Sequence, residues 1–166
     1  MRSLIIIAHN VRSGHNVGSL LRTAEGLGVE RVYLTGYTPY PVVDGDMRLP
    51  HIAQKNHKLI TKTALGAESS IPIEQSNDIN AVIDKVKNDS YIVCALEQSA
   101  KAVPLPSFKP PEKIALIVGR EVEGLEQDVL VMCDKILEIP MFGKKESFNV
   151  VQAAAMALYH LRFFGT

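Results

Sequence analysis

Short apolar runs alternate along this chain with longer segments in which apolar residues recur every three or four positions. A short continuous apolar run is typical of a buried strand, whereas the wider spacing places apolar side chains on one face of a helix. The runs predict strands at residues 4–8, 31–35, 71–74, 91–96, 114–118 and 135–139. The spaced pattern predicts helices at residues 17–27, 62–67, 78–88, 127–133 and 150–164.

Two segments between these elements, residues 36–56 and 101–111, are rich in proline or glycine, and we expect both to be loops. A loop as long as the first is usually functional in a compact domain. Strands that alternate with helices predict an α/β fold, with a mostly parallel sheet and helices on both of its faces. The length of 166 residues suits a single domain over residues 1–166.

The overall charge argues against binding of nucleic acid through bulk positive charge, because 18 basic residues are balanced by 18 acidic ones. The distribution of charge is less even, since residues 47–67 contain no acidic residue. The cationic and histidine side chains of this segment are Arg48, His51, Lys55, His57, Lys58 and Lys62. The segment is either a solvated basic loop or a surface for a polyanion, and the pattern leaves both interpretations open.

The sequence indicates neither a membrane span nor a metal site. Every apolar run is far shorter than the ~20 residues that cross a bilayer. The first run is also too short for a signal peptide, because His9 and Asn10 interrupt it. Cys94 and Cys133 lie among apolar residues, which predicts reduced thiols and a cytoplasmic location. No spacing of Cys and His is typical of zinc, so we expect no metal.

Three segments place glycine beside polar groups next to predicted strands or helices, where α/β proteins bind ligands. In the first, residues 16–24, Arg22 lies opposite the apolar stripe of the predicted helix. Arg22 is either a solvent-facing side chain or a guanidinium that grips phosphate in a bidentate way. Gly18 and Gly26 would leave that side of the helix open for a bulky group.

The second segment, residues 117–125, follows a predicted buried strand. Gly119 permits a close backbone approach, Gly124 permits a turn, and Glu121 can counter a cationic ligand. The same pattern is also compatible with a simple turn. Because no G-x-G-x-x-G fingerprint is present, a dinucleotide-binding fold has no direct support.

The third segment, residues 139–150, joins a predicted strand to a polar loop and then to an alanine-rich helix. Gly143, Ser147 and Asn149 allow a sharp turn that offers backbone and side-chain groups to a ligand. Asn149 or Ser147 is also a candidate N-cap of the last helix. The small residues of that helix would let another backbone come close.

In their order and spacing the three segments resemble the motifs of the SpoU (TrmH) family of RNA ribose 2′-O-methyltransferases, within the SPOUT superfamily, over nearly the whole chain. The first motif corresponds to Asn16, Gly18, Arg22, Thr23 and Ala24, and the second to Gly119, Arg120, Glu121 and Gly124. The third corresponds to Ile139, Pro140, Met141, Gly143, Glu146, Ser147, Asn149 and Val150. The chain departs from the family pattern at Val122, where many relatives have glycine.

The resemblance implies a deep trefoil knot over about residues 114–166, which would be a rare exception to ordinary chain connections. It also implies a homodimer with the alanine-rich face of the last helix at the interface. The implied cofactor is S-adenosylmethionine (AdoMet), bent within the knot. The implied cofactor-binding residues are Leu96, Gly119, Arg120, Glu121, Ile139, Met141, Ser147, Phe148 and Asn149. The implied catalytic residues are Asn16, Arg22, Glu121, Ser147 and Asn149.

The implied reaction is in-line attack of a ribose 2′-hydroxyl of tRNA or rRNA on the sulfonium methyl. The resemblance assigns acceptance of the hydroxyl proton to Arg22, assisted by Ser147 and Asn149. Because a guanidinium has a pKa above about 12, the alternative is that Arg22 binds the adjacent phosphate and stabilises the developing alkoxide. The expected RNA contacts are Arg12, Arg22, Arg48, Lys55, Lys58 and Lys62.

Three other functions compete with this interpretation. The first is a binding module that holds AdoMet or RNA without catalysis. The second is a nucleotide-binding α/β enzyme of another class, such as a reductase, against which the missing glycine fingerprint counts. The third is a SPOUT enzyme that methylates a base atom, against which the Arg22 motif counts.

Overall fold

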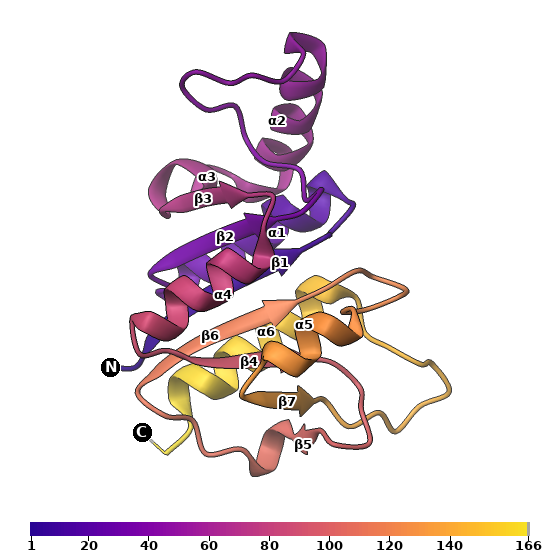
Figure 1. The fold of residues 1–166 in the computed structure, drawn as a ribbon. Coiled ribbons are helices and arrows are strands. Elements are labelled where there is room, and N and C mark those ends of the chain that lie inside the picture. The colour runs from indigo at the N-terminus through magenta and orange to yellow at the C-terminus, as the bar shows by residue number, and fades with distance from the viewer. Residues whose placement is uncertain (166) are drawn as a thin grey trace.

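The computed structural model describes residues 1–165, and these residues build one sheet of seven strands (Figure 1). Every pairing is parallel, in the order β3-β2-β1-β6-β4-β7-β5. The predicted α/β class with a mostly parallel sheet is therefore confirmed. The strands are β1 (Ser3–His9), β2 (Arg31–Thr35), β3 (Ile73–Ser76), β4 (Ile92–Leu96), β5 (Val103–Pro104), β6 (Lys113–Val118) and β7 (Lys135–Glu138).

Helices cover both faces of the sheet, as predicted (Figure 1). They are α1 (Gly14–Gly26), α2 (Pro50–Ala64), α3 (Ala67–Ser70), α4 (Ile79–Asn88), α5 (Gln127–Met132), α6 (Val150–Phe163) and a short 3₁₀ helix, η1 (Leu105–Ser107). Alternate residues of a strand point to opposite faces. Leu4 and Ile6 of β1 therefore join the core beneath α1 and α6, while Ile5 and Ile7 join the core beneath α4 and α5.

The chain changes from one face of the sheet to the other at its two middle strands, β1 and β6. After β1 the chain enters α1 on one face, and after the neighbouring strand β6 it enters α5 on the other face. Loops that leave adjacent parallel strands toward opposite faces separate at the carboxyl ends, which is where open α/β sheets bind ligands. The first motif lies in α1, directly after β1, and the second lies in the loop that leaves β6.

The prediction of a loop over residues 36–56 is wrong in its last part, because α2 begins at Pro50. Proline is favoured in the first turn of a helix, where its missing N–H has no partner to lose. The short helix predicted at residues 62–67 is largely the end of α2. A Cβ atom on Gly18 would lie 2.1 Å from the carbonyl oxygen of Ile60 in α2, so Gly18 permits close packing of two helices. The prediction that Gly18 leaves its side of α1 open is therefore wrong, whereas a Cβ on Gly26 would meet nothing within 4 Å.

Smaller differences concern the sheet edges and the last helix. Strand β3 starts two residues later than predicted, because its ladder with β2 pairs Val32 with Ile73. The predicted loop at residues 101–111 contains β5 and η1. Ala154 and Ala157 of α6 are fully buried within their own chain. These two alanines are therefore not available to a second copy, contrary to the prediction for the alanine-rich face.

Both cysteines are free thiols. Burial raises the pKa of Cys94 to about 12 and that of Cys133 to about 11, so both stay protonated at neutral pH. Among the described residues, no helix combines the length and apolar character that crossing a membrane requires. The trefoil knot and the single domain over residues 1–166 stay predictions, because strand order does not establish either.

Candidate functional site

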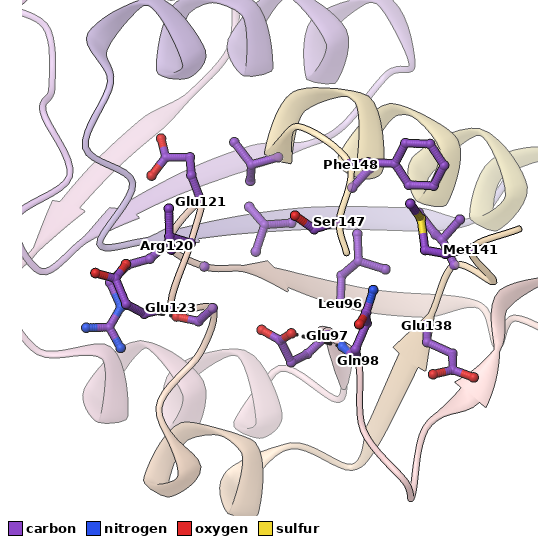
Figure 2. A pocket seen from close by; sticks show the side chains of 17 residues that line it. Leu96, Glu97, Gln98, Arg120, Glu121, Glu123, Glu138, Met141, Ser147 and Phe148 are labelled. Carbon is purple, nitrogen blue, oxygen red and sulfur yellow. Dashed lines mark hydrogen bonds between the residues drawn. The ribbon is translucent and has the colours of Figure 1, made fainter. Parts of the chain in front are cut away.

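A pocket lies at the carboxyl ends of β4, β6 and β7, between the loops that follow these strands (Figure 2). Every predicted cofactor-binding residue except Asn149 lines this pocket. The predicted residues that line it are Leu96, Gly119, Arg120, Glu121, Ile139, Met141, Ser147 and Phe148. Three segments distant in sequence thus meet at one surface, as expected for loops at the same edge of a parallel sheet.

The lining combines an apolar side with an excess of carboxylates. Leu96, Ile139, Met141 and Phe148 supply the apolar part. Figure 2 shows the carboxylates of Glu97, Glu121 and Glu138 around Ser147, and Glu123 lies nearby. The cationic side chain in the lining is Arg120, whose guanidinium is 3.2 Å from Glu126 Oε1 and donates to the Gly124 carbonyl. The remaining negative charge favours a ligand that carries positive charge.

Glu97, which the sequence interpretation missed, fastens the loop after β6. Its carboxylate accepts hydrogen bonds from the backbone amides of Leu125 and Gln98, both at 2.9 Å. Gly124 has a φ of 68°, and a Cβ there would lie 2.1 Å from Glu97 Oε2. Gln98 then donates to the carbonyl of Glu146 in the third motif. An acidic residue directly after a buried strand was the available signal for this contact.

Side-chain hydrogen bonds join the three motifs. Asn16 of α1 donates from Nδ2 to Glu121 Oε1 at 2.9 Å. Asn149 Nδ2 lies 3.4 Å from Asn16 Oδ1, which links the third motif to the first. Asn149 also caps α6 by accepting a bond from Val151 N at 2.9 Å, so its predicted capping role is correct. Asn16, Glu121 and Asn149 therefore form one connected group at the mouth of the pocket.

Arg22 is not part of this group. It lies on the exposed side of α1, six residues beyond Asn16, and it does not line the pocket. Within residues 1–165 its guanidinium makes no hydrogen bond or ion pair. The structure of one chain thus leaves Arg22 free for a contact with another molecule.

A second polar cluster, also missed, lies where β1 ends. His9 is 7% exposed and its Nδ1 lies 2.9 Å from Thr35 Oγ1, while its Nε2 lies 3.4 Å from Glu126 Oε2. Glu126 in turn pairs with Arg120 of the second motif. Burial lowers the pKa of His9, Arg120 acts in the same direction, and Glu126 opposes both. The cluster ties the end of β1 to the loop that forms the pocket.

The predicted RNA contacts separate into two groups. Lys55, Lys58 and Lys62 share one face of α2 and, with His15 and His51, line a shallow groove. We call these five residues the α2 basic face, although His15 comes from the neighbouring helix α1. Of the other predicted contacts, Arg22 is unpaired within residues 1–165, whereas Arg12 and Arg48 have partners within the chain. The guanidinium of Arg12 pairs with Glu123 at 3.1 Å.

Arg48 is the predicted RNA contact that the geometry supports least. Its guanidinium pairs with Asp46, donates to the carbonyls of Tyr40 and Pro41, and lies 3.4 Å from the centre of the Tyr40 ring. These contacts engage the guanidinium within the loop before α2. Arg48 is therefore less available to a phosphate than the lysines of α2 are, and its contact with RNA stays a prediction.

The chain resembles known methyltransferases in sequence and in fold. It is 27% identical over 159 residues to a tRNA (guanosine(18)-2′-O)-methyltransferase of Borreliella burgdorferi, covering 95% of this chain and 65% of the relative. A solved RNA 2′-O ribose methyltransferase is 26% identical with a TM-score of 0.78, covering 96% of this chain and 55% of that one. The chain thus spans about two thirds or less of the length of these relatives.

One further neighbour was solved with a ligand. The AviRb SpoU methyltransferase of Streptomyces viridochromogenes, in complex with AdoMet, has a TM-score of 0.76 at 22% identity, covering 96% of this chain and 59% of that chain. At this identity the likeness concerns the fold alone. The described residues contain no group of three or more side chains that could hold a metal ion. Since the model of the SpoU rRNA Methylase family matches residues 3–159, the chain belongs to that family.

Proposed function

We propose that this chain is an AdoMet-dependent RNA methyltransferase that modifies a ribose 2′-hydroxyl of tRNA or rRNA. The observation that carries the proposal is the meeting of all three motifs at one pocket, through the bonds from Asn16 to Glu121 and from Asn149 to Asn16. Family membership and the names of the relatives support the same reaction. The family is described by rRNA methylation and the Borreliella burgdorferi relative is named for tRNA, so the target RNA stays open between these two classes.

The residues that line the pocket fit AdoMet. The apolar side formed by Leu96, Ile139, Met141 and Phe148 suits an adenosine, and the excess of carboxylates suits a sulfonium and an amino group. Backbone groups near Gly119 can approach the ligand closely because this residue has no side chain. Asn149 contributes indirectly, since it caps α6 and fixes Asn16.

In the proposed mechanism the chain acts mainly by positioning. When bound, AdoMet supplies a methyl group on a sulfonium, which is already a good electrophile. Correct orientation of the ribose hydroxyl then contributes up to about 7–11 kcal/mol in favourable cases. Ser147 and Asn149 hold the hydroxyl in line, and Glu121 balances positive charge at the pocket mouth. Arg22 either accepts the hydroxyl proton, or binds the adjacent phosphate and stabilises the alkoxide while phosphate or water accepts the proton.

The direct test is incubation with tritium-labelled AdoMet and unmodified total RNA, followed by digestion to nucleosides. A labelled 2′-O-methylnucleoside is the expected product, and the size of the labelled RNA distinguishes tRNA from rRNA. A label on a base would support the competing base methyltransferase. Binding of AdoMet without any label would support a binding module that lacks catalysis.

The α2 basic face is the proposed contact for the phosphates of the RNA. His15 belongs to this face and the next residue, Asn16, belongs to the network at the pocket, so the two surfaces adjoin. Reversal of charge at Lys55 and Lys58 is expected to weaken RNA binding roughly tenfold and to reduce its salt dependence, because two phosphate contacts are lost. Filter binding at several salt concentrations measures both effects.

The matched control reverses Lys101 and Lys109, two exposed lysines of the segment around β5. This control changes the net charge equally, so RNA affinity close to wild type is expected if the α2 basic face is the binding surface. AdoMet affinity should stay unchanged in both variants. Equal weakening by both double variants would instead indicate non-specific attraction, and would contradict the assignment.

The proposal includes a homodimer built on α6. The outward side of this helix carries large apolar residues: Met156 is 37% exposed, Tyr159 62% and Phe163 48%. Arg22 also supports a two-fold dimer. Because it lies outside the pocket of its own chain, it could act in the reaction only by reaching the pocket of a second copy. The deep knot over about residues 114–166, one domain over residues 1–166 and a cytoplasmic location, which the free thiols support, belong to the same proposal.

Substitution of Tyr159 by glutamate is expected to convert the dimer to a monomer, because the interface would bury an unpaired charge. Light scattering across a range of protein concentrations measures this change. Tyr37→Glu is the control, since Tyr37 is 53% exposed in the loop after β2. A monomeric wild type, or a Tyr159→Glu variant that remains dimeric, would refute the assigned interface.

A further inference from the structure

Phe142, Lys144 and Lys145 lie beside the pocket, and neither the motifs nor the proposed mechanism assigns these three side chains a role. Met141 and Ser147, on either side, line the pocket. Between them Phe142 is 98% exposed, although a phenylalanine side chain normally gains free energy from burial. In Figure 1 this part of the loop between β7 and α6, drawn in gold, extends away from the sheet.

Two lysines follow Phe142 in the same segment. Lys144 and Lys145 are exposed, and within the part of the chain that the structure describes neither forms an ion pair. The far end of the segment is held, because Gln98 donates a hydrogen bond to the carbonyl of Glu146. A Cβ atom on Gly143 would meet nothing within 4 Å, so the space beside this residue is open.

We propose that Phe142, Lys144 and Lys145 bind an unstacked nucleotide of single-stranded RNA next to the target ribose. This inference rests on the proposed function and adds to it the conformation of RNA that the enzyme accepts. An exposed aromatic ring stacks on any base, and the adjacent lysines neutralise the phosphates on either side. In a duplex the bases are already stacked on one another, so the ring would find no face to contact.

The position of Phe142 gives this contact a function in the reaction. It directly follows Met141, which lines the pocket, so a base held by Phe142 keeps its own or its neighbouring ribose at the pocket mouth. The α2 basic face can attract an RNA helix through its phosphates, whereas the ring of Phe142 selects a loop or an end where bases are free. The two surfaces would together favour a single-stranded segment beside a helix.

The first experiment measures the affinity of AdoMet-saturated protein for a short labelled single-stranded RNA, and for the same RNA in a duplex, by fluorescence anisotropy. Phe142→Ala is expected to weaken single-strand binding roughly 5- to 150-fold, the usual effect of losing one stacking contact. Duplex binding should change little. Phe142→Trp should retain the affinity, whereas Phe142→Leu, which keeps an apolar side chain without a ring, should lose most of it.

The contribution of the two lysines is measured from the salt dependence of RNA binding. The Lys144→Ala/Lys145→Ala variant should reduce the slope of log affinity against log salt by about 0.7 for each phosphate contact on a single strand. Val131→Ala is the control for the loss of an exposed apolar side chain in Phe142→Ala, because Val131 is 74% exposed on α5 and does not line the pocket. This control should bind single-stranded RNA as wild type does.

Several results would overturn the inference. Unchanged single-strand affinity in Phe142→Ala, or wild-type protein that binds neither RNA, would refute a stacking role for Phe142. Dissociation of a wild-type dimer by Phe142→Ala in light scattering would show that the ring faces a second copy instead. Failure of the proposed function would give a separate result, because wild-type protein would then bind RNA but transfer no methyl group to any RNA.

Discussion

Replacement of Arg22 by alanine is expected to lower kcat by about 10²- to 10³-fold, the range found when one group that stabilises a developing oxyanion is removed. AdoMet affinity should not change, because Arg22 does not line the pocket. The fold should also persist, since Arg22 is exposed on α1 and alanine is the best helix former. Single-turnover methylation of RNA and calorimetric titration of AdoMet measure the two quantities separately.

Glu25→Ala is the matched control for this variant. Glu25 is exposed on the same helix, one turn further along, and its replacement should leave turnover within about twofold of wild type, as expected for a surface position without contacts. Normal turnover in Arg22→Ala would eliminate both proposed roles of the guanidinium. Loss of AdoMet binding in the same variant would instead move Arg22 into the cofactor site.

Arg22→Lys distinguishes the two roles. If residue 22 accepts the proton, activity of the lysine variant should increase as the pH approaches the ordinary lysine pKa of about 10.4, because only the neutral amine accepts a proton. If it binds phosphate and stabilises the alkoxide, activity should decrease over the same range, because the positive charge is lost. The sign of the pH dependence therefore decides between them.

Local patterns predicted most of the fold because its central strands, β1 and β6, are buried on both faces. Continuous apolar runs such as residues 4–8 and 114–118 need no knowledge of their neighbours to be recognised. Helix α2 is the opposite case, since of its 15 residues only Ala53, Ile60 and Ala64 are buried. Its position depends on contact with α1 through Gly18, which the sequence of α2 does not reveal.

The pocket lining was predictable where the chain matches the motifs of the family. Gly119 directly follows β6 and Ser147 lies just before α6, both belong to motifs, and both line the pocket. The contacts that join the motifs were not predictable, because Asn16 and Glu121 are 105 residues apart. Any polar residue near a motif could make such a bond, and only the packing of α1 against the sheet selects Asn16.

The second large effect is expected at Gly124. Gly124→Ala should weaken AdoMet binding by about a hundredfold, because two costs combine at the pocket. A φ of 68° is unfavourable for alanine by roughly 1–2 kcal/mol. The new Cβ would also displace the Glu97 carboxylate, which leaves the amide of Leu125 without its acceptor, at a cost of about 1–3 kcal/mol. Calorimetric titration of AdoMet measures the loss.

Gly45→Ala separates these costs, because Gly45 has nearly the same φ, 71°, but a Cβ there would meet nothing within 4 Å. This control should lose only the stability that the backbone strain accounts for, and it should bind AdoMet as wild type does. Glu97→Ala completes a double-mutant cycle. In that background the clash no longer exists, so Gly124→Ala should add far less than it does in wild type. Fully additive losses would mean that Glu97 and Gly124 act on AdoMet independently, and that the loop after β6 is not held by this carboxylate.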